Sequence, residues 1–195
     1  CLDQMQQNHA GAVATEDPEY IHQMRVATRR LHVVLRLFSP ILPTEFTQAL
    51  KVAFKPLMQQ LGRVRDLDVL HTEIVAPALA ALPEEPRLVA LSNEITLRRH
   101  HARTAAQASL QAAGYGHNLL VVLQTLHAEI PAQEQPSPPL AIFAAKRLRH
   151  LGKLLTRQAR TARTDNPASL HVLRITSKRL RYTLEFFSPL ATHRK

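Results

Sequence analysis

The sequence predicts an all-α protein, built as helical bundles with an internal repeat. Five glycines occur in 195 residues and alternating Val, Ile and Thr stretches are nearly absent, which disfavours a β-sheet. Apolar residues recur at helical spacing instead, and the thirteen prolines mostly fall between such segments. A segment near the N-terminus also returns near the C-terminus, which indicates two related helices.

Proline marks the ends of the first helices. Pro18 follows Asp17 and suits the first turn of a helix with an acidic N-terminus. Ser39, Pro40 and Pro43 close that helix and open the next, because proline lacks the backbone N–H that a helix interior needs.

The later helices are bounded by glycine and proline. Gly62 and Gly114 are predicted helix ends. Pro56 implies a kink or an early end of the third helix, and Pro189 is predicted to end the last one. The predicted helices cover residues 2–13, 18–38, 44–61, 62–81, 87–113, 116–129, 139–163 and 167–187.

One proline-rich stretch reads as a linker, with Pro131, Pro136, Pro138 and Pro139. It divides the chain into residues 1–135, expected to form a first helical bundle, and residues 136–195, expected to start a second helical repeat.

The repeat keeps its polar positions as well as its apolar ones. The segment from Ile21 to Leu31 returns from Leu170 to Leu180. The paired polar residues are His22 with His171, Arg25 with Arg174, Arg29 with Lys178, and Arg30 with Arg179. Two similar units that present cations in this way suggest a shared anionic target.

Three predicted helices carry a basic face without internal acids, which favours a binding surface over an ordinary solvated helix side. The first face holds His22, Arg25, Arg29, His32 and Arg36. Its copy holds His171, Arg174, Lys178 and Arg181, with Arg30 and Arg179 on the flanks of the two helices. The third holds Lys146, Arg149, His150, Lys153, Arg157 and Arg160.

The overall composition narrows the partner to a polyanion. A net charge of +10 favours nucleic acid, an anionic membrane or a phosphate polymer. Aromatic residues make up 5% of the chain, which counts against base stacking. No apolar run reaches the roughly 18–20 residues that span a bilayer. The single Cys1 excludes an internal disulfide and favours a cytosolic compartment.

Catalytic and metal motifs are lacking in the sequence. Asp66 and Asp68 diverge by about 200° on a helix, so we expect one to brace Arg or His side chains on a neighbouring helix rather than a shared acid–base role. No Ser/His/Asp order, P-loop or zinc motif occurs. The arginines beside His22 and His171 would repel a cation, so no metal site and no cofactor are expected.

Taken together, three ordered motifs resemble the CHAD family, the conserved histidine α-helical domain. They are the segment from His22 to Leu31, the block from Leu61 to Asp68, and the segment from His171 to Tyr182. The resemblance covers the chain from about Tyr20 to Leu190. It implies two four-helix bundles related by a pseudo-twofold, around a basic cavity or pore that binds inorganic polyphosphate.

Carried over by position, the resemblance implies a set of polyphosphate-binding residues. They are His22, Arg25, Arg29, Arg30 and Arg36, with His171, Arg174, Lys178, Arg179 and Arg181. The third basic helix, with Lys146, Arg149, His150, Lys153 and Arg157, would form a further wall.

Members of this family often accompany a triphosphate tunnel domain or polyphosphate enzymes, and some lie on polyphosphate granules. The family's second half normally extends further than this chain does, so the second bundle is expected to be truncated. Its exposed apolar helix faces would then favour a homodimer.

The sequence therefore predicts a cytoplasmic, non-catalytic module that binds polyphosphate. Two alternatives remain: nucleic-acid binding, or a polyphosphate-processing enzyme in which His22 or His171 is phosphoacceptor or general acid. Docking of an acidic protein is a more distant third. Charge reversal at Arg25 and Arg174 is predicted to weaken polyphosphate binding far more than reversal at Arg98 and Arg99.

Overall fold

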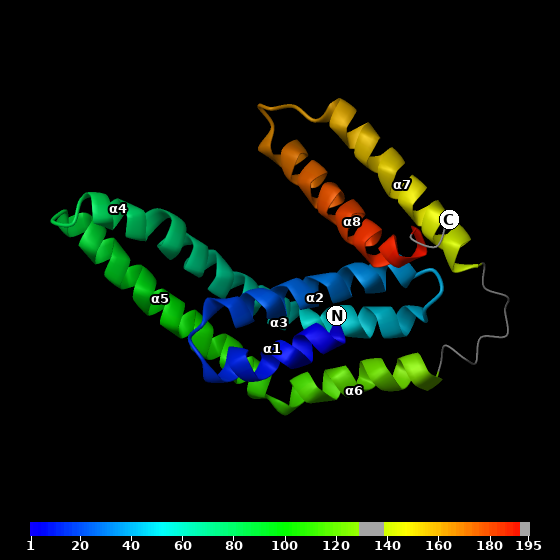
Figure 1. Cartoon of the computed structure of the whole chain (residues 1–195), viewed down its shortest axis with the longest axis horizontal. Coiled ribbons are helices and arrows are strands. Elements are labelled where there is room, and N and C mark those ends of the chain that lie inside the picture. Colours follow the sequence, from blue (N-terminus) through cyan, green and yellow to red (C-terminus); the bar gives the residue numbers. More distant parts are fainter. Residues whose placement is uncertain (129–138, 192–195) are drawn as a thin grey trace. The chain divides into compact units, whose positions relative to one another are not determined.

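The computed structural model describes residues 1–128 and 139–191, and these residues are all-α, as predicted (Figure 1). The predicted linker from Pro131 to Pro138, and the predicted boundary between residues 135 and 136, lie outside the described residues. The helices are α1 (Leu2–Ala14), α2 (Pro18–Phe38), α3 (Thr44–Leu70), the π-helical turn η1 (His71–Val75), α4 (Ala76–Ala81), α5 (Pro86–Gln111), α6 (Ala113–Ala128), α7 (Leu140–Thr161) and α8 (Pro167–Ala191).

The chain divides into two compact units, and α2 contributes to both. The first unit comprises Cys1–Leu31 and Thr44–Pro131, whereas the second comprises His32–Pro43 and Ala132–Lys195. The last two turns of α2 therefore belong with α7 and α8 rather than with the helices that follow α2 in sequence.

Large apolar side chains fill the centre of the first unit, where α3 packs along α5. Those that are fully buried are Met5, Ile21, Met24, Leu50, Leu61, Val64, Leu110 and Val122. They come from α1, α2, α3, α5 and α6 at helical spacing, so one apolar face from each helix builds this core.

Phenylalanines join the three helical segments of the second unit, in which α7 packs along α8. Phe38 stacks on Phe143 with ring centroids 5.3 Å apart and meets Phe187 edge-on at 6.3 Å. Leu37, Phe143, Ala144 and Phe187 are buried in this cluster. Phe38 and Phe187 hold equivalent positions in the sequence repeat, so the two copies of the motif meet at this core.

Three predicted helix ends are wrong. Gly62 lies inside α3, which continues to Leu70. Gly114 lies in the first turn of α6, and Pro189 lies inside the last turn of α8. Pro56 also sits within α3 without ending it. Buried neighbours explain α3, because Leu61 and Val64 beside Gly62 are fully buried and outweigh the cost of one glycine, about 1 kcal/mol.

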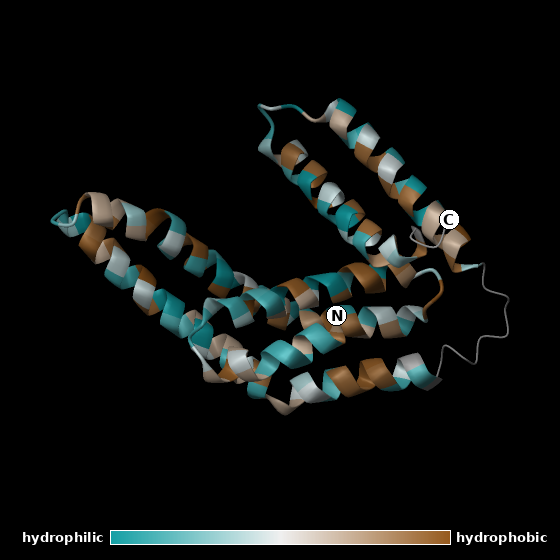
Figure 2. Cartoon of the chain, viewed as in Figure 1, coloured by the Kyte–Doolittle hydropathy of each residue, from teal (hydrophilic) through white to brown (hydrophobic). Residues whose placement is uncertain are grey.

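Hydropathy alternates around the helices, as Figure 2 shows along α7 and α8, where hydrophobic and hydrophilic residues interleave. Among the helices described, none is both long enough and apolar enough to cross a membrane.

Candidate anion-binding site

Five basic side chains line one pocket in the second unit. His32 and Arg36 come from the end of α2, Arg147 and His150 from α7, and Arg179 from α8. The pocket has a volume of about 150 Å³. Its remaining lining residues are Val33, Leu37, Leu151, Leu154 and Thr183. The end of α2 and the consecutive helices α7 and α8, which are distant from α2 in sequence, thus bring their basic residues to one concave site.

The pocket has a buried floor and an exposed mouth. Leu37 belongs to the phenylalanine core, and Thr183 is 1% exposed and donates a hydrogen bond to the carbonyl of Arg179 at 2.8 Å. Arg36 and His150, by contrast, are exposed. Leu37 and Thr183 therefore form the floor of the pocket, and Arg36 and His150 lie at its mouth.

Arg147 is held in place at this pocket. Its Nη2 donates a hydrogen bond to the carbonyl oxygen of Arg36 at 3.3 Å. That carbonyl lies in the last turn of α2, where helix carbonyls lack partners within the helix. The contact ties α7 to the end of α2 and places a guanidinium beside the pocket.

No acidic residue is found among the residues that line the pocket. The acids in the described part of this unit are Asp165 and Glu185, and each contacts an arginine elsewhere. Asp165 Oδ2 lies 3.1 Å from Arg163 Nη2, and Glu185 Oε1 lies 3.5 Å from Arg181 Nε. The positive field of the pocket is therefore not balanced by a carboxylate in its lining.

Three of the predicted binding residues, Arg36, His150 and Arg179, lie together at the pocket. The others of the second unit lie outside its lining: Lys146, Arg149, Lys153 and Arg157 are exposed on α7, His171, Arg174 and Arg181 are exposed on α8, and Lys178 is half-buried on α8. Arg181 also packs over the ring of Tyr182, 4.9 Å from its centroid.

The predicted binding residues of the first unit are half-buried on α2. They are His22, Arg25, Arg29 and Arg30. Arg25 Nη2 lies 3.7 Å from Asp66 Oδ1, and Arg30 Nη1 donates to the side-chain oxygen of Gln4 at 3.2 Å. The imidazole of His22 has a buried Nδ1 without a hydrogen-bond partner among the described residues. Arg25 and Arg30 therefore have partners within their own unit.

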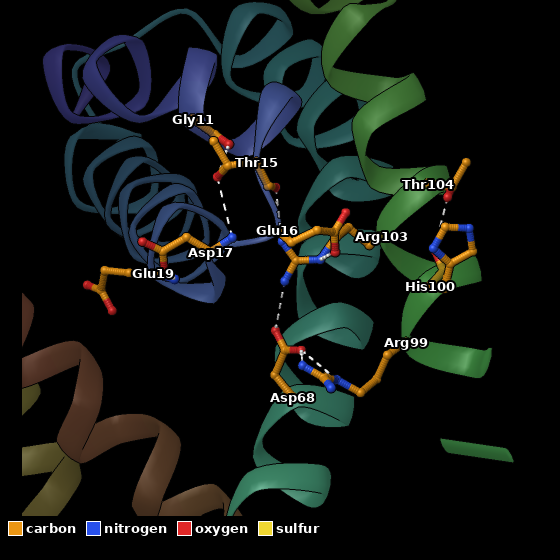
Figure 3. A network of polar contacts seen from close by, with 10 residues as sticks. All are labelled: Gly11, Thr15, Glu16, Asp17, Glu19, Asp68, Arg99, His100, Arg103 and Thr104. Carbon is orange, nitrogen blue, oxygen red and sulfur yellow. Dashed lines mark hydrogen bonds and ion pairs between the residues drawn. The ribbon is translucent and has the colours of Figure 1, made fainter. Parts of the chain in front are cut away.

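Asp68 has the bracing role that the sequence predicted for one of the two aspartates (Figure 3). Its Oδ1 lies 2.9 Å from Nε and Nη2 of Arg99, and its Oδ2 lies 3.5 Å from Nη2 of Arg103, both on α5. Arg103 also reaches Glu16, at 3.2 Å, and the carbonyl of Thr15. Asp68 and Arg103 are both nearly fully buried, so α3, α5 and the α1–α2 turn are joined by this network.

Asp66 points to a different helix and is largely exposed, which agrees with the predicted divergence of the two carboxylates. Arg99, with its ion pair to buried Asp68, is also unsuitable as the reference surface cation that the sequence suggested. Within the described residues, no group of three or more His, Cys, Asp or Glu is placed to hold a metal ion.

Comparison with known proteins settles the family. The sequence profile of the CHAD domain matches residues 1–195. The chain belongs to the CHAD family. Among solved structures, the crystal structure of the CHAD domain from the plant Ricinus communis matches with a TM-score of 0.82 and 32% sequence identity. The match covers 96% of this chain and 62% of that one, and a search of curated proteins gave no match.

Two pocket residues of this CHAD chain were missed by the sequence-based site. At about 100° per residue, Arg147 lies between the basic face of its helix and the apolar residues Leu151 and Leu155, a border position that gave the signal for an inward-facing cation. His32 was placed on the basic face of the first motif but was not assigned to the site. Arg36, four residues further along the same helix face, was assigned to the site, so helical spacing alone would have placed His32 there too.

Proposed function

We propose that this CHAD chain binds inorganic polyphosphate and that the basic pocket of the second unit is the centre of the site. The observation that carries this proposal is the convergence of His32, Arg36, Arg147, His150 and Arg179 around one pocket without an acid in its lining. Guanidinium groups bind phosphoryl oxygens through paired, charge-assisted hydrogen bonds. Protonated imidazoles add further donors.

The character of the pocket walls favours polyphosphate over nucleic acid. Proteins that bind single-stranded nucleic acid stack bases on aromatic side chains. The uncharged walls of this pocket are formed by Val33, Leu37, Leu151, Leu154 and Thr183, none of which is aromatic. Polyphosphate has no bases, so its binding does not depend on aromatic stacking.

The same lining favours binding over catalysis. A histidine that acts as general base or nucleophile is usually oriented by a carboxylate or a similar acceptor. His32 and His150 share the pocket with arginines and with no carboxylate of the lining. We therefore propose a non-catalytic module, in which the histidines serve as donors.

Family membership and exposed apolar side chains on α8 support further proposals about oligomeric state, location and partners. Leu170, Val172, Ile175 and Leu184 are exposed on α8 and could support a homodimer. We further propose a cytoplasmic location, with polyphosphate granules as one site, and association with a triphosphate tunnel domain or polyphosphate enzymes.

The direct test is calorimetric titration of the double variant Arg147→Ala, Arg179→Ala with long-chain polyphosphate. Each lost charge-assisted contact is worth about 1.5–3 kcal/mol, so affinity should fall by roughly tenfold or more per arginine. The matched control is Arg87→Ala, Arg98→Ala, which removes the same charge from exposed positions on α5, outside the pocket and the basic faces. Equal losses from the two variants would contradict a defined site and leave only net charge.

A further inference from the structure

We propose that the pocket of the second unit receives the terminal phosphate of a polyphosphate chain rather than an inner segment. This inference rests on the proposed function and specifies which part of the polymer the site recognises. It follows from two properties of the pocket, namely its buried floor and its charge.

Two buried side chains form the floor of the pocket. Leu37 is 4% exposed and packs into the phenylalanine core with Phe143 and Phe187, while Thr183 is 1% exposed. The hydroxyl of Thr183 is also engaged by the carbonyl of Arg179. An inner segment of a polymer needs a way in and a way out, whereas a chain end needs only the mouth between Arg36 and His150. A pocket of about 150 Å³ over such a floor is thus suited to one end group.

The charge of the lining matches an end group as well. A terminal phosphate presents three non-bridging oxygens and a charge of about −1.5 to −2 near neutral pH, as a phosphate monoester does. An inner phosphate presents two such oxygens and a single charge. Arg36, Arg147 and Arg179 offer three guanidiniums from three helices. A group with three acceptor oxygens can meet all of them, each with a charge-assisted hydrogen bond.

The remaining basic residues of α7 then have a separate role. Lys146, Arg149, Lys153 and Arg157 are exposed outside the pocket. They would contact the inner phosphates of the same chain through long-range attraction, which depends on salt and not on the chain end. Binding therefore has two components, one set by chain ends and one by chain length.

Long-chain polyphosphate with both terminal phosphates capped as alkyl phosphoramidates separates these components. Capping changes the end groups and leaves the inner charges in place. We expect the capped chain to bind at least tenfold more weakly than the uncapped chain of the same length in calorimetry. Linear tripolyphosphate should likewise displace the uncapped chain, and ring-shaped trimetaphosphate, which has no ends, should do so far less well.

The double variant Arg147→Ala, Arg179→Ala tests whether the pocket causes the difference between capped and uncapped chains. In this variant the difference between capped and uncapped chains should disappear, whereas the control Arg87→Ala, Arg98→Ala should retain it. Circular dichroism of each variant shows whether the fold is kept. Equal binding of capped and uncapped chains by the unaltered protein would overturn end recognition while leaving polyphosphate binding intact. No binding of either chain would overturn the proposed function itself.

Discussion

Asp66 and Asp68 lie on one helix but contribute differently to the stability of the fold. Asp68 is 2% exposed and joins Arg99 and Arg103, whereas the side chain of Asp66 is 77% exposed and lies 3.7 Å from Arg25. Removal of one partner from a buried ion pair leaves an uncompensated charge in the interior. The same change at an exposed pair costs little, because solvent already screens the charges.

We therefore predict that Asp68→Asn lowers the free energy of unfolding by about 3 kcal/mol, since buried Arg103 keeps only the exposed Glu16 as a carboxylate partner. The matched variant Asp66→Asn should change it by less than about 1 kcal/mol. Urea denaturation followed by circular dichroism measures both values. Similar losses from the two variants would contradict the bracing role of Asp68.

Tyr115 gives a pH-dependent prediction. Its ring stacks on His9 with centroids 4.9 Å apart, and its buried hydroxyl has no hydrogen-bond partner among the described residues. Burial raises the pKa of Tyr115 from 10.0 to about 12, because the charged phenolate is poorly solvated there. The folded state thus holds the proton more tightly than the unfolded state. The free energy of unfolding is therefore unaffected by this titration below pH 10, and it falls as the pH rises from 10 to about 12 because the unfolded state loses the proton first.

Tyr115→Phe removes both the unsatisfied hydroxyl and this titration. We expect the variant to be as stable as the parent or more stable by about 1–2 kcal/mol at neutral pH. Its advantage should grow between pH 10 and pH 12, the interval in which the parent loses stability. Thermal unfolding of the two proteins side by side at several pH values checks this. A constant difference across that interval would show that the hydroxyl is not buried in solution.

At the scale of the helices, two glycines allow the effect of helix packing to be compared with that of helix propensity. A Cβ atom at Gly11 on α1 would overlap the ring of Tyr20 on α2, so this glycine permits the two helices to approach. At Gly62, inside α3, a Cβ would meet no atom within 4 Å. The same substitution should therefore have opposite effects at the two positions.

Gly11→Ala is predicted to cost about 1–3 kcal/mol of stability, because the added methyl forces the ring or the helix to move. Gly62→Ala is predicted to stabilise the protein by up to about 1 kcal/mol, as alanine does in a helix interior. Shifts of the thermal midpoint in opposite directions would support this account. Tolerance of Gly11→Ala would show that α1 does not pack closely on α2.

Helices were predictable from sequence and their ends less so. The starts of α2, α3 and α8 fall where the prediction put them, since proline and threonine mark them locally. The continuation of α3 past Gly62 was not predictable, because it depends on burial of Leu61 and Val64 by other helices. The π-helical turn at His71–Val75 likewise has no local sequence signal that we can identify.

At the scale of the whole molecule, the division of α2 between two units was not visible in the sequence. The apolar face of α2 runs on without a break through Leu31 and Leu35. The packing of Phe38 on Phe143 and Phe187, together with the hydrogen bond from Arg147 to the carbonyl of Arg36, assigns the helix end to the second unit. The pocket depends on this assignment, because His32 and Arg36 reach Arg147 and Arg179 only within that unit.

Charge also acts across the molecule and makes binding depend on salt. For a polyanion, the logarithm of the affinity falls linearly with the logarithm of the salt concentration, with a slope of roughly 0.7–0.9 per phosphate contact. The variant Arg147→Ala, Arg179→Ala should therefore show a slope that is shallower by about 1.5. Titrations at several salt concentrations measure it, and an unchanged slope would place these arginines outside the interface.

The most direct test of polyphosphate binding at the pocket is a competition titration at physiological salt. The protein is titrated with long-chain polyphosphate in calorimetry, alone and in the presence of single-stranded RNA of matched total charge. Saturable binding that RNA does not displace, and that Arg147→Ala with Arg179→Ala weakens by roughly a hundredfold, is the predicted result. Displacement by RNA, or full binding by the double variant, would contradict it.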